Sequence, residues 1–382
     1  MQPRRWLIVV ESIALKLVFG ILPLNFDCRS KRFRKRLANV MFCVVFLVLF
    51  AVLGPFVCVA LYTNNLSAEN SITKLLGAVQ FTFIYLVILV VQVMFIVKKE
   101  TLYGLLNEMF ELKHDLETAQ SRTLSGFSMY SLMFLKILLL DFTVSLSSLV
   151  SFEEDIPKLA LSSVLFYAMM HFVSIIENLI LLGLAICGTM QVMINTIVKQ
   201  LARRPIWSKQ ASAPSLVQMY MAHCRNEEIV KKFMDTLNFP TLMLTGWYFF
   251  MIIFAVYYMY VYAFEASERG MKWDEVKACM VPFIYLLYQC VQLYLLMLVP
   301  SVYTDRAKKM MRLLNLVCAN QPHHHARQDR LIELLMVDCL QRNYSISNYG
   351  MYAINRALLF GMIATITSYL IILIQFHIQE YK

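Results

Sequence analysis

Seven apolar runs divide this 382-residue chain, and each is long enough to cross a membrane. They cover approximately residues 37–62, 75–97, 131–151, 161–188, 239–264, 279–300 and 357–376. A helix rises about 1.5 Å per residue, so about 20 residues match the roughly 30 Å hydrocarbon core of a bilayer. Backbone polar groups in lipid must be satisfied internally, which makes helices the default. The pattern therefore predicts an all-α membrane protein with seven transmembrane helices.

The composition argues against a set of soluble domains. Hydrophobic residues make up 59% of the chain and charged residues only 16%, and the mean hydropathy is +0.60. Such a chain cannot cover its own surface with polar groups, so the lipid bilayer must cover it. The net charge of +10 is spread between the apolar runs rather than gathered in a basic domain. We therefore expect no nucleic-acid partner.

The basic residues also predict the orientation of the chain. Of the 35 Lys and Arg residues, 28 lie in the amino-terminal segment and in the loops that follow the second, fourth and sixth runs. Loops on the cytoplasmic side carry such an excess. We therefore expect a cytoplasmic amino terminus and an extracellular carboxyl terminus. Asn65, in the sequon Asn65-Leu66-Ser67, then falls outside the cell and is a glycosylation candidate.

Polar side chains follow one face of the last predicted span. At helical spacing this face carries Gly361, Thr365, Ser368, Ile372, Gln375 and Gln379. Small residues at this spacing suit a close helix-packing seam. They equally suit the wall of a pore built by several copies of the chain around an axis, with Ile372 as a hydrophobic ring. The pattern alone leaves both interpretations open.

Polar residues inside the other spans point to a ligand cavity. Intramembrane ionisable residues such as Asp141, His171 and Glu177 normally face a bundle interior or a cavity. An outward-opening cavity between the second and sixth spans suits a small organic molecule, and internal hydrogen bonding is the alternative. The candidate ligand-binding residues are Asp141, Tyr167, His171, Ser174, Tyr257, Tyr285, Tyr288 and Gln289. Asn178 and Gln292 are further polar groups in these spans, and Lys136 lies within the third.

Catalytic and metal-binding signatures receive no support. Nothing matches a P-loop, a nucleophile elbow or H-E-x-x-H. The run His323-His324-His325 looks like a cytoplasmic turn, because consecutive side chains splay apart and cannot all reach one ion from a regular helix. The nine cysteines include no C-x-x-C pair. We expect no enzyme activity, no cofactor and no metal site.

The stretch Ser368-Tyr-Leu-Ile-Ile-Leu-Ile-Gln-Phe376 resembles the carboxy-terminal signature of insect gustatory receptors. That signature is Thr-Tyr, five hydrophobic residues, then Gln-Phe. Ser368 replaces the Thr and keeps its hydroxyl group, and Tyr369, Gln375 and Phe376 match. The length, the seven spans, the cytoplasmic amino terminus and a short apolar segment at 18–26 are similar to the family over the whole chain.

The resemblance implies a ligand-gated, non-selective cation channel that depolarises sensory neurons when a small tastant binds. It implies a homo- or heterotetramer with other gustatory receptors, located in the plasma membrane of the dendrite, axon and cell body. The last span would line the pore, with Gln375 and Phe376 at the outer constriction. A short, divergent member is expected to respond to a bitter or aversive compound rather than to a sugar.

The sequence predicts that the chain has five parts. They are a cytoplasmic segment at 1–36, a six-span ligand-binding bundle with its loops at 37–300, a cytoplasmic anchor region at 301–356, a pore-lining span at 357–376 and an extracellular tail at 377–382. Helical patterning in 189–238 and 301–356 predicts that spans four to seven continue inward as helices and pack together.

Three other functional classes remain as alternatives. An odorant receptor would share the inverted topology, and only the Ser368–Phe376 signature favours taste. A G-protein-coupled receptor conflicts with the cytoplasmic amino terminus, and the chain has no D-R-Y after the third span and no N-P-x-x-Y in the seventh. A transporter predicts an internal repeat with paired broken helices, and the sequence contains neither.

Overall fold

The computed structural model describes residues 24–27, 32–64, 71–119, 132–133, 135–141, 160–203, 215–269, 273–319 and 326–380. Asn65, the histidines at 323–325, the first 23 residues and most of the predicted third span lie outside this part of the chain. The third span is represented by a π-helical segment, η3 (Lys136–Asp141).

Helices dominate the described residues. They are α2 (Leu37–Asn64), α3 (Ser71–Val97), α4 (Lys99–Ala119), α7 (Ala160–Arg203), α8 (Leu216–Arg269), α9 (Trp273–Ala319), α10 (Ala326–Gln341) and α11 (Arg356–Glu380). Six of them, namely α2, α3, α7, α8, α9 and α11, are long and apolar enough to cross a membrane. The six contain the predicted spans other than the third, so the structure confirms the predicted membrane fold.

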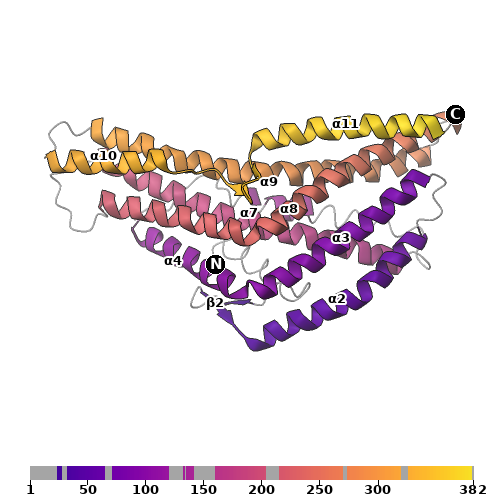
Figure 1. The fold of residues 1–382 in the computed structure, drawn as a ribbon, viewed down its shortest axis with the longest axis horizontal. Coiled ribbons are helices and arrows are strands. Elements are labelled where there is room, and N and C mark those ends of the chain that lie inside the picture. Colours follow the sequence, from indigo (N-terminus) through magenta and orange to yellow (C-terminus); the bar gives the residue numbers. More distant parts are fainter. Residues whose placement is uncertain are drawn as a thin grey trace.

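Three helices extend far beyond the thickness of a bilayer. Helices α7, α8 and α9 contain 44, 54 and 47 residues, so they are about 66–81 Å long, at least twice the hydrocarbon thickness. Their inner ends pack together with α4 and α10, at the end of the molecule opposite the outer ends of α2, α3 and α11 (Figure 1). These packed helical ends lie where the sequence predicted the cytoplasmic anchor. Pro240 lies near the middle of α8, and a proline inside a helix is a usual cause of a kink.

The segment between α10 and α11 corrects one expectation. Helical patterning was expected through residue 356, but α10 ends at Gln341 and a hairpin follows, formed by β3 (Ser347–Asn348) and β4 (Tyr352–Ala353). Tyr349 and Gly350 have φ angles of 49° and 71°, and the Met351 N–H donates to the Asn348 carbonyl over 2.9 Å. Positive φ at both central residues is typical of tight hairpin turns rich in Asn and Gly. These two residues favour a turn over a continued helix, although the surrounding sequence has helical periodicity.

A second hairpin, also not predicted, lies before the first span. It pairs β1 (Leu24–Asp27) with β2 (Arg32–Lys35) in antiparallel register. Leu24 and Phe33 are buried, and the Phe33 N–H donates to the Asn107 side-chain oxygen of α4 over 2.8 Å. This hairpin therefore attaches the start of α2 to α4.

The helices differ strongly in how much of their surface the subunit itself covers. In the apolar stretch of α7, 94% of the residues are buried, whereas in α11 only 11% are. Helix α7 is therefore the centre of the bundle. Helix α11 runs along one edge of it (Figure 1) and leaves most of its surface to lipid, to water or to other copies of the chain.

Candidate functional site

A cluster of charged side chains is buried within the membrane bundle. Lys136 of η3 lies 3.3 Å from a carboxylate oxygen of Asp141 and 3.7 Å from one of Glu177 on α7. It also donates a hydrogen bond to Asn178. The Lys136 and Glu177 side chains are almost completely buried. Charges in such surroundings persist only when they are paired, and here one cation is shared between two carboxylates.

Hydroxyl and amide groups complete the cluster. The Tyr248 hydroxyl of α8 donates to Glu177 over 2.5 Å. From α9, the Tyr288 hydroxyl and the Gln292 amide donate to the same Asp141 oxygen over 3.2 and 3.1 Å. The Gln292 amide also lies 3.5 Å from the Ser174 hydroxyl. The cluster thus links η3, α7, α8 and α9 in the middle of the bundle.

Several acceptor oxygens around the cluster have no hydrogen-bond donor among the residues that the structure describes. They are one Glu177 carboxylate oxygen and the side-chain oxygens of Gln289 and Gln292. Gln289 and Gln292 are three residues apart on α9 and therefore share a face. These features suit a ligand that brings N–H or O–H donors.

The structure brings some of the predicted ligand-binding residues together and separates others. Asp141, Ser174 and Tyr288 belong to the cluster. Gln289 is buried on the same helix as Tyr288, and Tyr285 packs its ring against Tyr288 and directs its hydroxyl to the Met170 sulfur. His171 is half-buried on α7, one turn from Ser174. Tyr257 lies elsewhere, against α11, and the Tyr167 side chain is outside the described residues.

The candidate set drawn up from the sequence omitted Lys136, Glu177 and Tyr248. Lys136 and Asp141 interrupt the same apolar run five residues apart, which was a usable signal for a charge pair. Glu177 stood out as an ionisable residue in a span, yet nothing in the sequence connects it to Lys136, 41 positions earlier, or to Tyr248, 71 positions later. Nothing in the residues around Tyr248 predicts that its hydroxyl contacts a buried carboxylate.

The polar face of α11 does not pack against its own subunit. The hydroxyl groups of Thr365 and Ser368 turn back to helix carbonyls one turn earlier, over 2.9 and 3.1 Å. Gln375 is exposed, as are Tyr369, Ile372 and Phe376 at 51%, 45% and 56%. The buried side is instead formed by Met362, Ile366 and His377. A packing seam within the subunit is therefore excluded for this face.

An aromatic cluster attaches the outer end of α11 to α8. His377 is completely buried, and its ring lies edge-on to Tyr257, Tyr260 and Phe264 with centroid distances of 6.2, 5.7 and 5.6 Å. His377 follows Phe376 directly, so one residue faces α8 while its neighbour points away. His377 was not among the residues predicted from the sequence.

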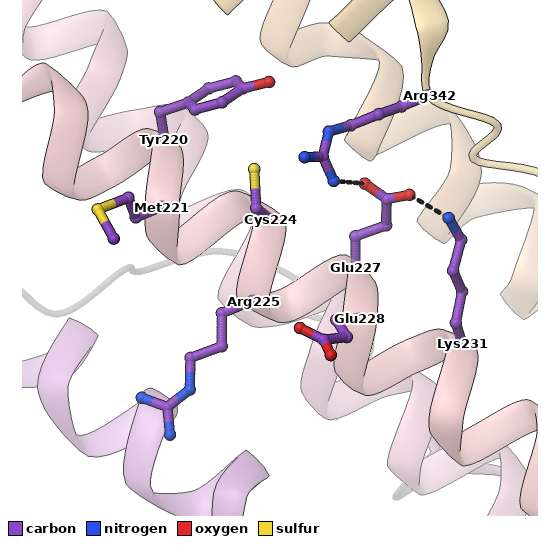
Figure 2. Close-up of a pocket in the computed structure, with 8 residues that line it drawn as sticks. All are labelled: Tyr220, Met221, Cys224, Arg225, Glu227, Glu228, Lys231 and Arg342. Atoms are coloured by element: carbon purple, nitrogen blue, oxygen red, sulfur yellow. Dashed lines mark hydrogen bonds and ion pairs between the residues drawn. The ribbon is translucent and has the colours of Figure 1, made fainter. Parts of the chain in front are cut away.

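A second polar network joins the helices of the cytoplasmic anchor. His223 of α8 is buried between the Gln191 side chain, 3.0 Å away, and the Tyr344 hydroxyl, 3.2 Å away. Arg342, just after α10, donates to Glu227 of α8 over 3.1 Å, and Lys231 donates to the other Glu227 oxygen over 2.6 Å (Figure 2). The network thereby fixes the segment that leads into α11.

Asp338 of α10 also belongs to this network and lies at its solvent-exposed edge. Hydrogen bonds from the Tyr220 hydroxyl and from Arg342 hold the pKa of Asp338 below its usual value. The carboxylate is therefore ionised at cytoplasmic pH. Its contribution to stability is present above the pKa of the unfolded chain and is lost only as the pH falls through the lower pKa of the folded state.

Replacing Arg342 by Ala is expected to destabilise the anchor by about 1–3 kcal/mol, because among the described residues the buried Glu227 carboxylate then keeps only Lys231 as a cationic partner. The apparent melting temperature of the detergent-solubilised protein measures the effect. Lys232→Ala is the matched control, since Lys232 pairs with Glu228 on the exposed surface and such pairs contribute little. Equal melting temperatures for the two variants would contradict the role assigned to Arg342.

Residues 14–380 match the model of the family described as 7tm Chemosensory receptor. Two solved structures of the insect olfactory receptor OR5 from Machilis hrabei are similar in fold, one in complex with eugenol and one without it, with TM-scores of 0.64 and 0.59. Each is 15% identical to this chain, and each match covers 98% of both chains. A search of curated proteins finds no match.

Proposed function

We propose, from the premise that this chain belongs to the 7tm chemosensory receptor family, that it is a gustatory receptor acting as a ligand-gated, non-selective cation channel. Binding of a small tastant would open the channel and depolarise the sensory neuron. The proposed site of action is the plasma membrane of the dendrite, axon and cell body. The proposed assembly is a homotetramer or a heterotetramer with other gustatory receptors.

The observation that carries the proposal is the exposure of the polar face of α11. The Thr365 and Ser368 hydroxyls bond carbonyls of their own helix, but the exposed amides of Gln375 and Gln379 would be costly against lipid. This face therefore needs a polar neighbour outside the subunit. Four copies of α11 around an axis would supply that neighbour and enclose water. The signature from Ser368 to Phe376, which matches that of gustatory receptors apart from its first residue, lies on this helix.

The proposed ion path runs along Thr365 and Ser368 to a constriction near the outer end of α11. Ile372 would form a hydrophobic ring that closes by dewetting. Gln375 and Phe376 would form the outer constriction, and both side chains are exposed on the subunit. His377 would hold the outer end of each α11 against α8 next to this constriction.

The proposed ligand site is the outward side of the buried cluster around Asp141. The Asp141 carboxylate and the three acceptor oxygens that have no donor among the described residues favour a ligand with a protonated amine or with hydroxyl groups. Many bitter compounds are amines, which agrees with an aversive tastant. Ligand binding would shift the bundle toward the open arrangement by binding that arrangement more tightly.

Recording membrane currents from cells that express the chain alone tests the proposal. We expect inward cation currents for amine tastants and weaker or no currents for sugars. Asp141→Asn should raise the half-activating concentration of an amine about tenfold or more, since hydrogen bonds to charged groups are worth about 1.5–3 kcal/mol. Tyr288→Phe should have a smaller effect in the same direction.

The matched control is Tyr294→Phe. Tyr294 lies on α9 like Tyr288, but its ring is 45% exposed on the outside of the bundle, so removing its hydroxyl should leave the dose response unchanged. Unaltered sensitivity in Asp141→Asn and Tyr288→Phe at equal surface expression would remove the cluster from the ligand site. Robust G-protein signalling without current would reject the channel itself.

An odorant receptor of the same topology is the second candidate, because the similar solved structures are olfactory receptors and one of them holds eugenol. The two candidates differ in the ligands that evoke current. Responses confined to volatile compounds would favour the odorant receptor.

A further inference from the structure

A basic pocket opens between the inner ends of α7 and α9. Its volume is about 510 Å³, and its lining contains Lys199 of α7 together with Arg306, Lys309 and Arg312 of α9. No carboxylate is among the lining residues, and the nearby Asp305 is exposed outside the lining. Lys199, Lys309 and Arg312 form no ion pair or hydrogen bond with any residue that the structure describes. Four like charges around one cavity repel one another unless an anion is present.

The wall of this pocket is held in place by hydrogen bonds. The Arg306 guanidinium donates to the Gly188 carbonyl of α7 over 3.2 Å. In return, the Asn195 amide of α7 donates to the Arg306 carbonyl over 2.9 Å, and the Asn195 oxygen accepts from Gln191 over 3.0 Å. These contacts cross-link the two helices at the pocket. The helix positions from which the four cationic side chains project are therefore fixed relative to one another.

The depth of the pocket places it where anionic headgroups and cytoplasmic solutes meet. The fourth and sixth predicted spans end near residues 188 and 300, and the lining residues at 192–199 and 306–313 begin 4–6 residues further along. At 1.5 Å per residue, the pocket lies about 6–20 Å beyond the end of the hydrocarbon core, on the cytoplasmic side. Basic pockets between transmembrane helices on the cytoplasmic side suit the headgroups of phosphorylated lipids.

We propose that this pocket binds a ligand with two or more phosphate groups on an inositol-type ring, either as a lipid headgroup or as a soluble polyphosphate. Arg312 can present a planar fork to a phosphate, the two lysines act as point charges, and Arg306, which already donates to Gly188, adds its positive charge. The bound anion would neutralise both helices at once and so stabilise the contact between α7 and α9 in the anchor. This inference does not depend on the ligand that opens the channel or on the pore itself.

Two arms of one experiment distinguish the sources of the phosphate. The full-length protein is placed in nanodiscs of phosphatidylcholine, and binding of labelled inositol hexakisphosphate is measured directly. In the second arm the soluble probe is left out, and about one-twentieth of the nanodisc lipid is phosphatidylinositol 4,5-bisphosphate. The melting temperature of the protein in these nanodiscs is compared with its melting temperature in nanodiscs that carry the same lipid charge as phosphatidylserine. Saturable binding in the first arm supports a soluble ligand, and a selective rise in melting temperature in the second supports a lipid.

Charge-matched variants test the assignment of the pocket. Lys309→Gln combined with Arg312→Gln should weaken binding roughly 25-fold, as expected for the loss of two cations that face phosphate near a membrane. Lys199→Gln, on the other helix, should weaken it about fivefold. Lys308→Gln combined with Arg330→Gln removes the same charge from exposed positions outside the lining and should change binding less than twofold. Absence of an effect in both wild-type arms, or equal losses in the two double variants, would overturn the proposal.

Discussion

Replacing Lys136 by Met is expected to abolish most surface expression, with a loss of stability of about 3–5 kcal/mol, the range for breaking a buried ion pair by removing one partner. Met is close to Lys in length, so packing changes little while the charge disappears. Asp141 and Glu177 would then face each other without the cation that lies 3.3 and 3.7 Å from them. Surface labelling and size-exclusion profiles of a fluorescent fusion measure the outcome.

Two further variants separate the charge effect from simple damage. Lys136→Met combined with Asp141→Asn removes one charge of each sign and should recover part of the lost expression, because one uncompensated carboxylate is gone. Lys308→Met makes the same side-chain change on the exposed surface of α9 and should express normally. If Lys136→Met alone expresses as well as Lys308→Met, the buried cluster is not what holds η3 to α7.

Replacing Phe376 by Ala is expected to produce a large current in the absence of ligand. In the proposed tetramer four Phe376 rings meet at one constriction, and aromatic contacts are worth about 0.5–1.5 kcal/mol each. A loss of about 0.5 kcal/mol per subunit sums to about 2 kcal/mol, which is roughly a 30-fold change in the ratio of open to closed channels. Gln375→Ala should instead alter the relative permeability of cations, because it removes a ring of polar groups from the path.

Phe360→Ala provides the matched control for the constriction. Phe360 is on the same helix, is 71% exposed on the subunit, and lies 16 residues earlier, which places it about 160° around the helix from Phe376. It should leave resting current and permeability unchanged. Normal currents from both Phe376→Ala and Gln375→Ala, with surface expression intact, would defeat the assignment of α11 as the pore helix.

The membrane architecture could be predicted because it rests on averages over long windows. Six of the seven predicted spans recur as helices since a run of about 20 apolar residues has few alternatives in lipid. The inward extension of α7, α8 and α9 followed from the same periodicity. The hairpin at 347–353 was missed because its turn depends on a few residues, with Tyr349 and Gly350 at positive φ, inside a segment of helical pattern.

The candidate site was only partly predictable because its contacts are distant in sequence. Asp141, Ser174 and Tyr288 could be chosen as costly polar groups in spans. The other members of the cluster come from three different elements: Lys136 of η3 pairs with Asp141, Tyr248 of α8 donates to Glu177, and Gln292 of α9 donates to Asp141. Tyr257 is also a tyrosine within a predicted span, but its ring contacts His377 of α11 instead of the cluster. Depth and polarity identify candidates, and only the packing of helices decides which of them meet.

The β3–β4 hairpin has a mechanical consequence. Its tight turn and the bond from the Ile354 N–H to the Ile346 carbonyl, 2.8 Å long, join α11 to the anchor through a short, stiff connection. With its base held, α11 acts as a lever of about 37 Å, the length of its 25 residues. If α11 rotates by about 5° about its end at the hairpin, its outer end moves by about 3 Å, which is the diameter of a water molecule.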